Sequence, residues 1–171
     1  MCRFALVVAL LTETGCSDNQ APSPDGPLFL AASVDGRSWA PGPEPGDLYA
    51  LLGPQRVILT ARRPTVQPPG EERLVVEFGT TDIFEHRNYR LAWEISGFAT
   101  FQVFTQPPGG PSEAFYSTSQ AHSGTLTIQA SNAVDSTITG AFAFDAAPLS
   151  GDAKVHRFSG QFRVRYSTTA P

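Results

Sequence analysis

Apolar and polar side chains alternate along most of the chain beyond residue 28. The period of two is clearest in four runs, at 56–61, 125–130, 137–144 and 158–166. In the second of these, Leu126, Ile128 and Ala130 alternate with polar residues. Such alternation predicts strands with one buried face and one solvated face. Weaker alternation predicts further strands at 28–34, 48–52, 73–78, 89–95, 98–105 and 114–118.

Turn signals such as Asp35-Gly36 and Gly53-Pro54 separate the predicted strands. No helical period of adequate length lies between them, which favours antiparallel pairing, because parallel sheets need helices on both faces. We therefore predict an all-β fold, an antiparallel β-sandwich or a flattened up-and-down barrel, of about nine or ten short strands. Residues 28–171 are expected to form one such domain.

Two glycines in the last strands stand where core side chains are expected. Gly140 and Gly160 occupy inward positions, each two residues before an aromatic residue, Phe142 or Phe162. A missing side chain at such a position leaves room for a facing ring or for a bulge. By the same alternation, Arg163 is expected on the solvated face.

The first residues of the chain differ in kind from the rest. Arg3 is followed by the eight apolar residues 4–11 and then by a polar stretch that ends in Gly15 and Cys16. The apolar run has the length of a signal-peptide core and is too short for a lasting transmembrane helix, which needs about 20 residues. Residues 1–15 are therefore predicted to be a signal peptide, and the polar, proline-rich residues 16–27 a flexible tether.

This arrangement resembles a bacterial lipoprotein signal, in which a cysteine after a small residue is lipidated and becomes the mature N-terminus. The resemblance implies lipid attachment at Cys16 and a membrane as partner, with Ser17 favouring the outer membrane over the inner membrane. Glu13 departs from the pattern, which usually has an aliphatic residue there. Two alternatives remain: an ordinary signal peptide with Cys16 as an incidental thiol, or a misassigned start.

Both ends of the predicted domain carry a recognisable pattern. Residues 30–39 read apolar-x-Ala-x-Val-Asp-Gly-x-x-Trp, and Gly-x-Phe-x-apolar recurs at 140–144 and 160–164. Asp35-Gly36 is expected to form a tight hairpin turn, after which Trp39 folds back over the first strand. The combination resembles a family of small secreted bacterial lipoproteins of unknown function, common in Bacteroidetes-like bacteria, with one β-rich domain. The resemblance implies location and fold, and it brings no catalytic or ligand-binding residues.

The amino-acid composition limits which classes of partner are expected. The formal net charge of −4 and the isoelectric point near 5.3 give no broad basic field for a phosphate backbone, so nucleic acid is not expected as a partner. Hydrophobic residues make up 41 % of the chain, enough for a sizeable core. Cys2 lies in the predicted signal and Cys16 would carry lipid, so the mature domain is expected to hold no disulfide.

The sequence contains no common catalytic motif, and we predict that the protein is not an enzyme. The three histidines, at positions 86, 122 and 156, stand far apart without the spacing of metal ligands, so neither a metal nor another cofactor is expected. Some of the acidic residues could pair for glycoside hydrolysis. These are Glu71, Glu72, Asp82, Glu85 and Glu94.

Aromatic side chains between positions 89 and 116 form the candidate binding surface. The segment 98–105 carries large apolar groups on both faces, so one face needs cover from the loop 106–112, from a partner protein or from a ligand such as a sugar ring. The candidate residues are Tyr89, Trp93, Phe98, Phe101, Phe104, Phe115 and Tyr116.

The sequence thus predicts a lipid-anchored extracytoplasmic β-domain with a non-enzymatic binding or envelope structural role, whose partner is an envelope protein or a glycan. Two other functions remain open. One is an extracytoplasmic hydrolase of glycans or lipids, and the other is a calycin-like barrel that encloses a small apolar ligand.

Overall fold

The computed structural model describes residues 26–66, 69–79, 87–92, 97–105, 112–148 and 154–168. These residues form one mixed sheet of eleven strands and no helix, which confirms the all-β prediction. The predicted signal peptide, Cys16 and most of the predicted tether lie outside the described residues. In the described part, no helix has the length and apolar character that crossing a membrane requires.

The strands follow one another along the chain with short connections. They are β1 (Phe29–Val34), β2 (Arg37–Trp39), β3 (Leu48–Leu52), β4 (Arg56–Val66), β5 (Pro69–Gly79), β6 (Asn88–Leu91), β7 (Gly97–Thr105), β8 (Ser112–Ser117), β9 (Gly124–Asn132), β10 (Thr137–Pro148) and β11 (His156–Ser167).

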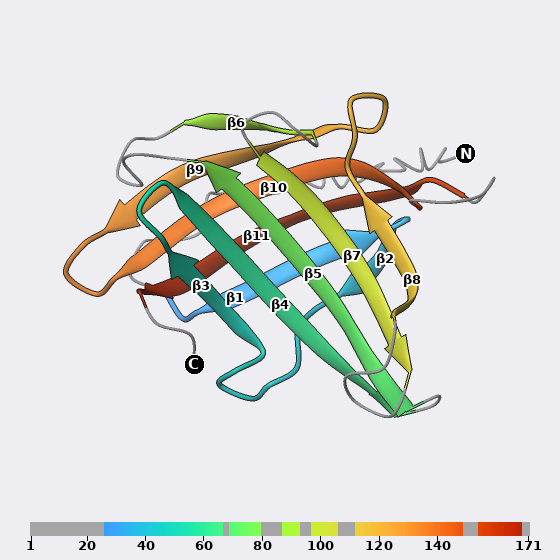
Figure 1. Cartoon of the computed structure of the whole chain (residues 1–171). Helices are drawn as coiled ribbons and strands as arrows, with labels where there is room; N and C mark the ends of the chain where they lie inside the picture. Colours follow the sequence, from blue (N-terminus) through green and yellow to red (C-terminus); the bar gives the residue numbers. More distant parts are fainter. Residues whose placement is uncertain are drawn as a thin grey trace, which may run out of the picture.

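The sheet curls into two layers that cross each other, as Figure 1 shows. Strands β3, β4, β5, β7 and β8 form the front layer, and β1, β2, β6, β9, β10 and β11 form the back layer. The layers join at two corners. The end of β10, at Ala147 and Pro148, pairs with β8, and the end of β11, at Tyr166 and Ser167, runs parallel to β3. Because β10 and β11 also pair with each other, the circuit closes, as expected of a sandwich or flattened barrel.

Aromatic rings fill the space between the layers. The ring of Phe158 on β11 stacks on Phe144 at 4.8 Å between centroids and meets Phe101 of the front layer at 5.2 Å. The inward positions predicted on 56–61, Val57, Leu59 and Ala61, are all buried. The alternation in the sequence therefore identified the core correctly, because each strand has one face against the opposite layer.

The predicted hairpin turn at Asp35-Gly36 is confirmed. Both residues have positive φ, 52° and 79°, as a two-residue turn between antiparallel strands requires. The turn leads into β2, a short strand that the alternation did not predict. Trp39 at its end is buried, with 3 % of its surface exposed, and packs between the layers as expected.

Strands β4 and β5 are longer than predicted, and the side chain of Arg163 is more buried than predicted. The runs 56–61 and 73–78 extend to eleven residues each in β4 and β5, which pair along their whole length. Arg163, expected in solvent, is only 5 % exposed. It lies on the outer face of β11, where its Nη2 donates to Asp135 at 2.9 Å, so an ion pair replaces solvation.

Candidate functional site

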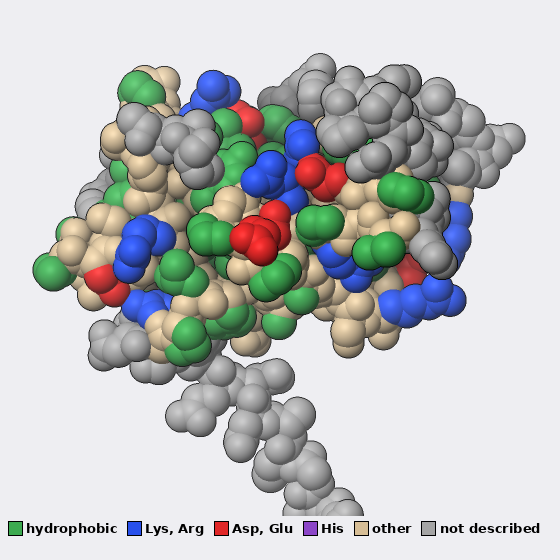
Figure 2. Space-filling view, turned by 90° about the horizontal axis from the view of Figure 1, so that it is seen from below, with side chains coloured by type: hydrophobic (Ala, Val, Ile, Leu, Met, Phe, Trp, Pro, Cys, Tyr) green, Lys and Arg blue, Asp and Glu red, His purple; other side chains and the backbone are tan. Residues whose placement is uncertain are grey.

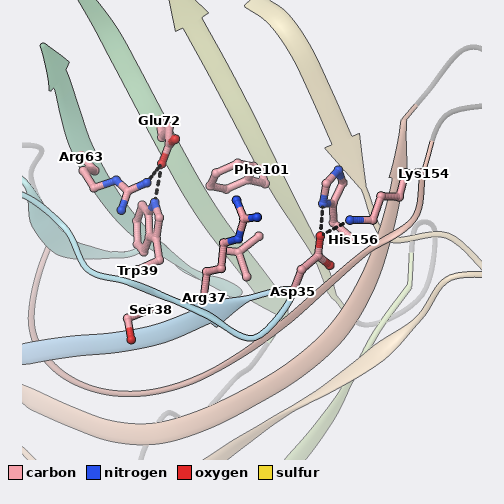
Figure 3. Close-up of a pocket in the computed structure, with 10 residues that line it drawn as sticks. Asp35, Arg37, Ser38, Trp39, Arg63, Glu72, Phe101, Lys154 and His156 are labelled. Carbon is pink, nitrogen blue, oxygen red and sulfur yellow. Dashed lines mark hydrogen bonds and ion pairs between the residues drawn. The ribbon is translucent and has the colours of Figure 1, made fainter. Parts of the chain in front are cut away.

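A pocket of about 390 Å³ opens between the two layers at one end of the sheet. The β1–β2 hairpin forms one wall, the inner faces of β4, β5 and β7 form the opposite wall, and the start of β11 closes one side (Figure 3). The back-layer hairpin extends past the closed circuit of strands, because β2 pairs with β1 and with no other described strand.

The hairpin presents two side chains to the pocket from the same face of β2. Arg37 and Trp39 are two residues apart and point toward the front layer, whereas Ser38 points away (Figure 3). The Trp39 ring meets the ring of Phe101 on β7 edge to face, at 6.1 Å between centroids. Together these two rings form the apolar floor of the pocket.

A carboxylate of the front layer holds Trp39 in place. Trp39 Nε1 donates to Glu72 Oε2 at 2.6 Å, and Arg63 Nη2 donates to the same oxygen. Arg63 and Glu72 are partners in the β4–β5 register, and the Arg63 guanidinium also lies 5.5 Å from the centre of the Trp39 ring. Glu72 thus accepts from a neutral donor and a charged donor at once.

A second carboxylate ties the hairpin turn to the start of β11. Asp35 Oδ2 accepts from Lys154 Nζ at 2.8 Å and contacts His156 Nδ1 at 2.8 Å, while the backbone N–H of Arg157 donates to Oδ1 at 3.0 Å. The hydrogen bond from Lys154, with those from Arg157 and His156, holds the pKa of Asp35 well below its usual range. Asp35 is therefore ionised at any physiological pH.

Among the charged residues that line the pocket, Arg37 is the one without a described polar partner. It is exposed, and within the part of the chain that the structure describes its guanidinium has no hydrogen bond or ion pair. In the view of Figure 3 the guanidinium lies between Trp39 and Asp35. Three cationic side chains line the pocket, Arg37, Arg63 and Lys154. Two carboxylates, Asp35 and Glu72, oppose them, so with histidine counted as neutral the pocket carries one excess positive charge.

The candidate aromatic residues from the sequence are divided between two faces. Phe101 and Tyr116 pair in register on the inner side of the front layer, and Tyr89 is buried against Phe78, with ring centroids 4.8 Å apart. Of these, Phe101 lines the pocket. Trp93 lies outside the described residues.

The other candidate aromatic residues are half-buried on the outer face of the front layer. Phe98 and Phe104 lie on β7 opposite Glu77 and Glu71 of β5, and Phe115 lies on β8 opposite Gln102. The Arg73 guanidinium packs over the Phe104 ring at 4.9 Å. The predicted binding surface is thus not one continuous patch, and a role of these residues in binding stays a prediction.

The predicted polar residues also separate. His156 lies in the pocket, where its ring also meets Tyr116 edge to face at 4.6 Å between centroids, whereas the backbone of His122 is bonded within a turn. Glu71 pairs with Arg73, and only its neighbour Glu72 lines the pocket. His86, Asp82, Glu85 and Glu94 lie outside the described residues. Among the residues described, no three His, Cys, Asp or Glu side chains gather as a metal site would need.

The face of the molecule shown in Figure 2 has no concentration of charge of one sign. Basic, acidic and apolar side chains are interspersed there and do not form a patch of one kind. Two of the arginines on the outer face of β11 are paired with aspartates, Arg157 with Asp145 and Arg163 with Asp135. Arg165, on the same strand, is exposed and has no described partner.

Sequence reasoning missed the pocket residues Arg37, Arg63 and Lys154, and it named Glu72 only as one of several acidic residues. A usable signal was present for two of these. Arg63 continues the inward parity of Val57, Leu59 and Ala61, and Glu72 has the parity of Leu74. Opposite charges at inward positions of two neighbouring strands indicate a polar site at the end of the core.

Comparisons of the chain with protein-family models, with curated proteins and with solved structures found no match. The geometry of the described residues is therefore the basis for a functional conclusion.

Proposed function

We propose that the protein is a lipid-anchored, extracytoplasmic binding domain without enzymatic activity, and that the pocket between its layers holds the ligand. The apolar run 4–11 followed by Gly15 and Cys16 supports the anchor. The observation that carries the binding role is the pocket itself, with an apolar floor of Trp39 and Phe101 and an unpaired guanidinium at its mouth. Small-molecule sites commonly combine such a floor with a few oriented polar groups.

The two carboxylates of the pocket favour binding over glycoside hydrolysis. A glycoside hydrolase needs one carboxyl group that carries a proton to the leaving group. Asp35 is unsuited to that task, because its hydrogen bonds from Lys154, Arg157 and His156 hold its pKa well below the usual range of an aspartate, so it has no proton to give at neutral pH. Glu72 accepts from Trp39 and Arg63 and so has a structural task of its own.

The interior between the layers is packed with side chains, which favours a ligand site at the end of the sheet and not at its centre. Phe78, Phe158 and Phe162 are fully buried between the layers, and several rings there are in contact. A calycin-like site would need that space for its ligand. The pocket at the open end leaves this packing intact.

The binding role can be tested with the indole N–H signals of the full-length protein in detergent micelles. The chain has two tryptophans, Trp39 in the pocket and Trp93 in the candidate aromatic segment, so a nitrogen–proton spectrum shows two indole peaks. Trp93→Phe assigns them. We expect hits from a fragment library to shift the Trp39 peak. A screen in which hits shift only the Trp93 peak, or in which no fragment binds, contradicts the pocket as the binding site.

The anchor has a separate test. Metabolic labelling with a clickable palmitate analogue should tag the wild-type protein and not Cys16→Ala, because lipidation requires the thiol. Cys2→Ala is the matched control, since Cys2 lies in the predicted signal peptide and its loss should leave labelling unchanged. Equal labelling of wild type and Cys16→Ala would remove the anchor from the proposal and leave the pocket untouched.

A further inference from the structure

We infer that the ligand of this pocket is a small organic anion, a carboxylate carried on a ring, and that Arg37 binds the carboxylate. The inference rests on the proposed function, because it names the ligand of the same pocket. It assigns Arg37 a recognition role that is distinct from the structural roles of the other charged residues around it.

Of the charged groups around the pocket, the two carboxylates are engaged within the fold and Arg37 is not. Glu72 already accepts from Trp39 and Arg63. Asp35 likewise accepts from Lys154, His156 and the backbone of Arg157. Both carboxylates are thus occupied within the fold, and a cationic ligand would have to displace these donors. The guanidinium of Arg37, by contrast, has all five of its N–H donors free of described partners.

The shape and position of the Arg37 guanidinium suit a carboxylate. An arginine guanidinium is a planar fork that matches the two oxygens of a carboxylate and binds them with two parallel hydrogen bonds. Arg37 is fixed close behind the Asp35-Gly36 turn, and Asp35 ties that turn to the start of β11. The backbone that carries the fork is therefore held in position before a ligand arrives, which lowers the entropy lost on binding.

Two aromatic side chains of the pocket can contact the part of the ligand that carries the carboxylate. Trp39 and Phe101 line the pocket beside the Arg37 guanidinium and give it an apolar floor (Figure 3). A volume of about 390 Å³ lies at the small end of the range for ligand pockets, which starts near 300 Å³. An aromatic acid or a sugar acid has this size, and in both a ring can contact the floor while the carboxylate meets Arg37.

The test is a titration of the full-length protein in micelles with two matched pairs of probes, benzoate against benzamide and glucuronate against glucose. The Trp39 indole signal is the readout, and the ionic strength is held constant, because exposed charges are screened by salt. We expect at least one acid to bind about 10-fold or more tightly than its uncharged counterpart, a difference of about 1.4 kcal/mol. The pair that shows the preference identifies the ring class.

Three variants connect that preference to the guanidinium. Arg37→Gln should abolish it, and Arg37→Lys should keep only part of it, because lysine retains the charge and loses the fork. Arg165→Gln is the matched control, since Arg165 is also an exposed arginine without a described partner and lies outside the pocket. It should leave the preference unchanged.

Equal binding of acid and uncharged probe overturns the inference, as does an acid preference that survives in Arg37→Gln. Failure of both acids to bind overturns it as well. In each of these cases the proposed function still stands if other fragments shift the Trp39 signal, so the two failures are distinguishable.

Discussion

The ring of Phe162 on β11 lies directly over Gly140 on β10, and the ring of Phe142 lies over Gly160 in the same way. Each glycine is the register partner of the phenylalanine that covers it. A β-carbon on either glycine would come within 2.7 Å of the Cζ atom of the facing ring. The repeated Gly-x-Phe pattern therefore interlocks the two central strands of the back layer.

This packing predicts that Gly140→Ala and Gly160→Ala destabilise the protein. The added methyl group would also meet backbone atoms, the carbonyl oxygen of Thr127 or of Ala31, which have little freedom to move. We expect each substitution to lower the free energy of unfolding by about 1–3 kcal/mol, as overpacking of a core does. Urea unfolding followed by tryptophan fluorescence measures the effect.

Gly53→Ala serves as the control for this prediction. A β-carbon at Gly53 would make ordinary contacts of 3.5 Å with Arg56, so its unfolding midpoint should stay near that of the wild type. If all three alanine variants unfold at the same urea concentration, the interlocked pairs do not constrain the core as described.

The hydrogen bonds to Glu72 predict a graded response to its replacement. Glu72→Ala leaves the buried Trp39 indole N–H without its acceptor and Arg63 without its ion-pair partner, so we expect a loss of about 1–3 kcal/mol in unfolding free energy. Glu72→Gln keeps an acceptor for the indole and should cost less.

Thermal or urea unfolding gives this comparison, with Glu77→Ala as the control on the same strand. Glu77 pairs with Arg56 at 3.3 Å, but the Arg56 side chain is 61 % exposed, and such surface pairs contribute about 0–1 kcal/mol. A loss at Glu77 as large as that at Glu72 would contradict a special role for the pocket carboxylate.

Asp35 predicts an acid-dependent contribution to stability. Its pKa is lowered in the folded state, chiefly by the hydrogen bond from Lys154, so it stabilises the fold above the pKa of the unfolded chain and loses that effect as pH falls. Asn tolerates positive φ, so Asp35→Asn removes the charge without straining the turn. The melting temperature of the variant should lie below that of the wild type at pH 7, and the gap should begin to narrow as the pH falls below about 4, the pKa of an aspartate in the unfolded chain.

The control for the acid dependence is Asp145→Asn. Asp145 pairs with Arg157, whose side chain is 82 % exposed, and its loss should hardly change the melting temperature at either pH. A gap for Asp35→Asn that is the same at pH 7 and at pH 3 would show that its charge does not hold the hairpin to β11.

Much of this fold follows from residues that are visible in the sequence. The inward parity of Leu126 and Ile128 is confirmed by their burial, and the Asp35-Gly36 turn and the two Gly–Phe pairs follow from simple steric requirements. These features are local, or they repeat along a strand. Side-chain alternation and turn geometry are therefore sufficient to predict them.

The pocket was beyond such reasoning because it depends on sheet order. Arg37, Arg63 and Lys154 come from three distant parts of the chain, and alternation does not say which strand lies opposite which. The run 56–61 ends before Arg63 and the run 73–78 begins after Glu72, since polar residues at inward positions interrupt the apolar pattern. The ion pair between them is what allows both strands to continue.

The burial of Arg163, on the outer face of the sheet, also could not be predicted from side-chain alternation. Parity placed it correctly on the outer face of β11 and wrongly predicted that it is exposed, because the burial comes from the β9–β10 connection and its Asp135. We expect Asp135→Ala to cost about 2 kcal/mol or more, since it leaves the charge of Arg163, a residue that is only 5 % exposed, without its counter-charge.

Arg163→Met should cost less than Asp135→Ala, because it removes the buried charge and keeps an apolar side chain. Urea unfolding of both variants and of the double variant gives the coupling between the two residues. Additive effects in that cycle would mean that the two residues stabilise the fold independently and would contradict the described pair.

Binding of a ligand between the hairpin and the front layer can be seen in a crystal structure of the protein purified from the cells that make it and soaked with the acid that binds best. We expect electron density for a carboxylate within hydrogen-bond distance of the Arg37 guanidinium, with its ring on Phe101. Density for that acid elsewhere on the molecule, with none in this pocket, would show that the pocket is not the binding site.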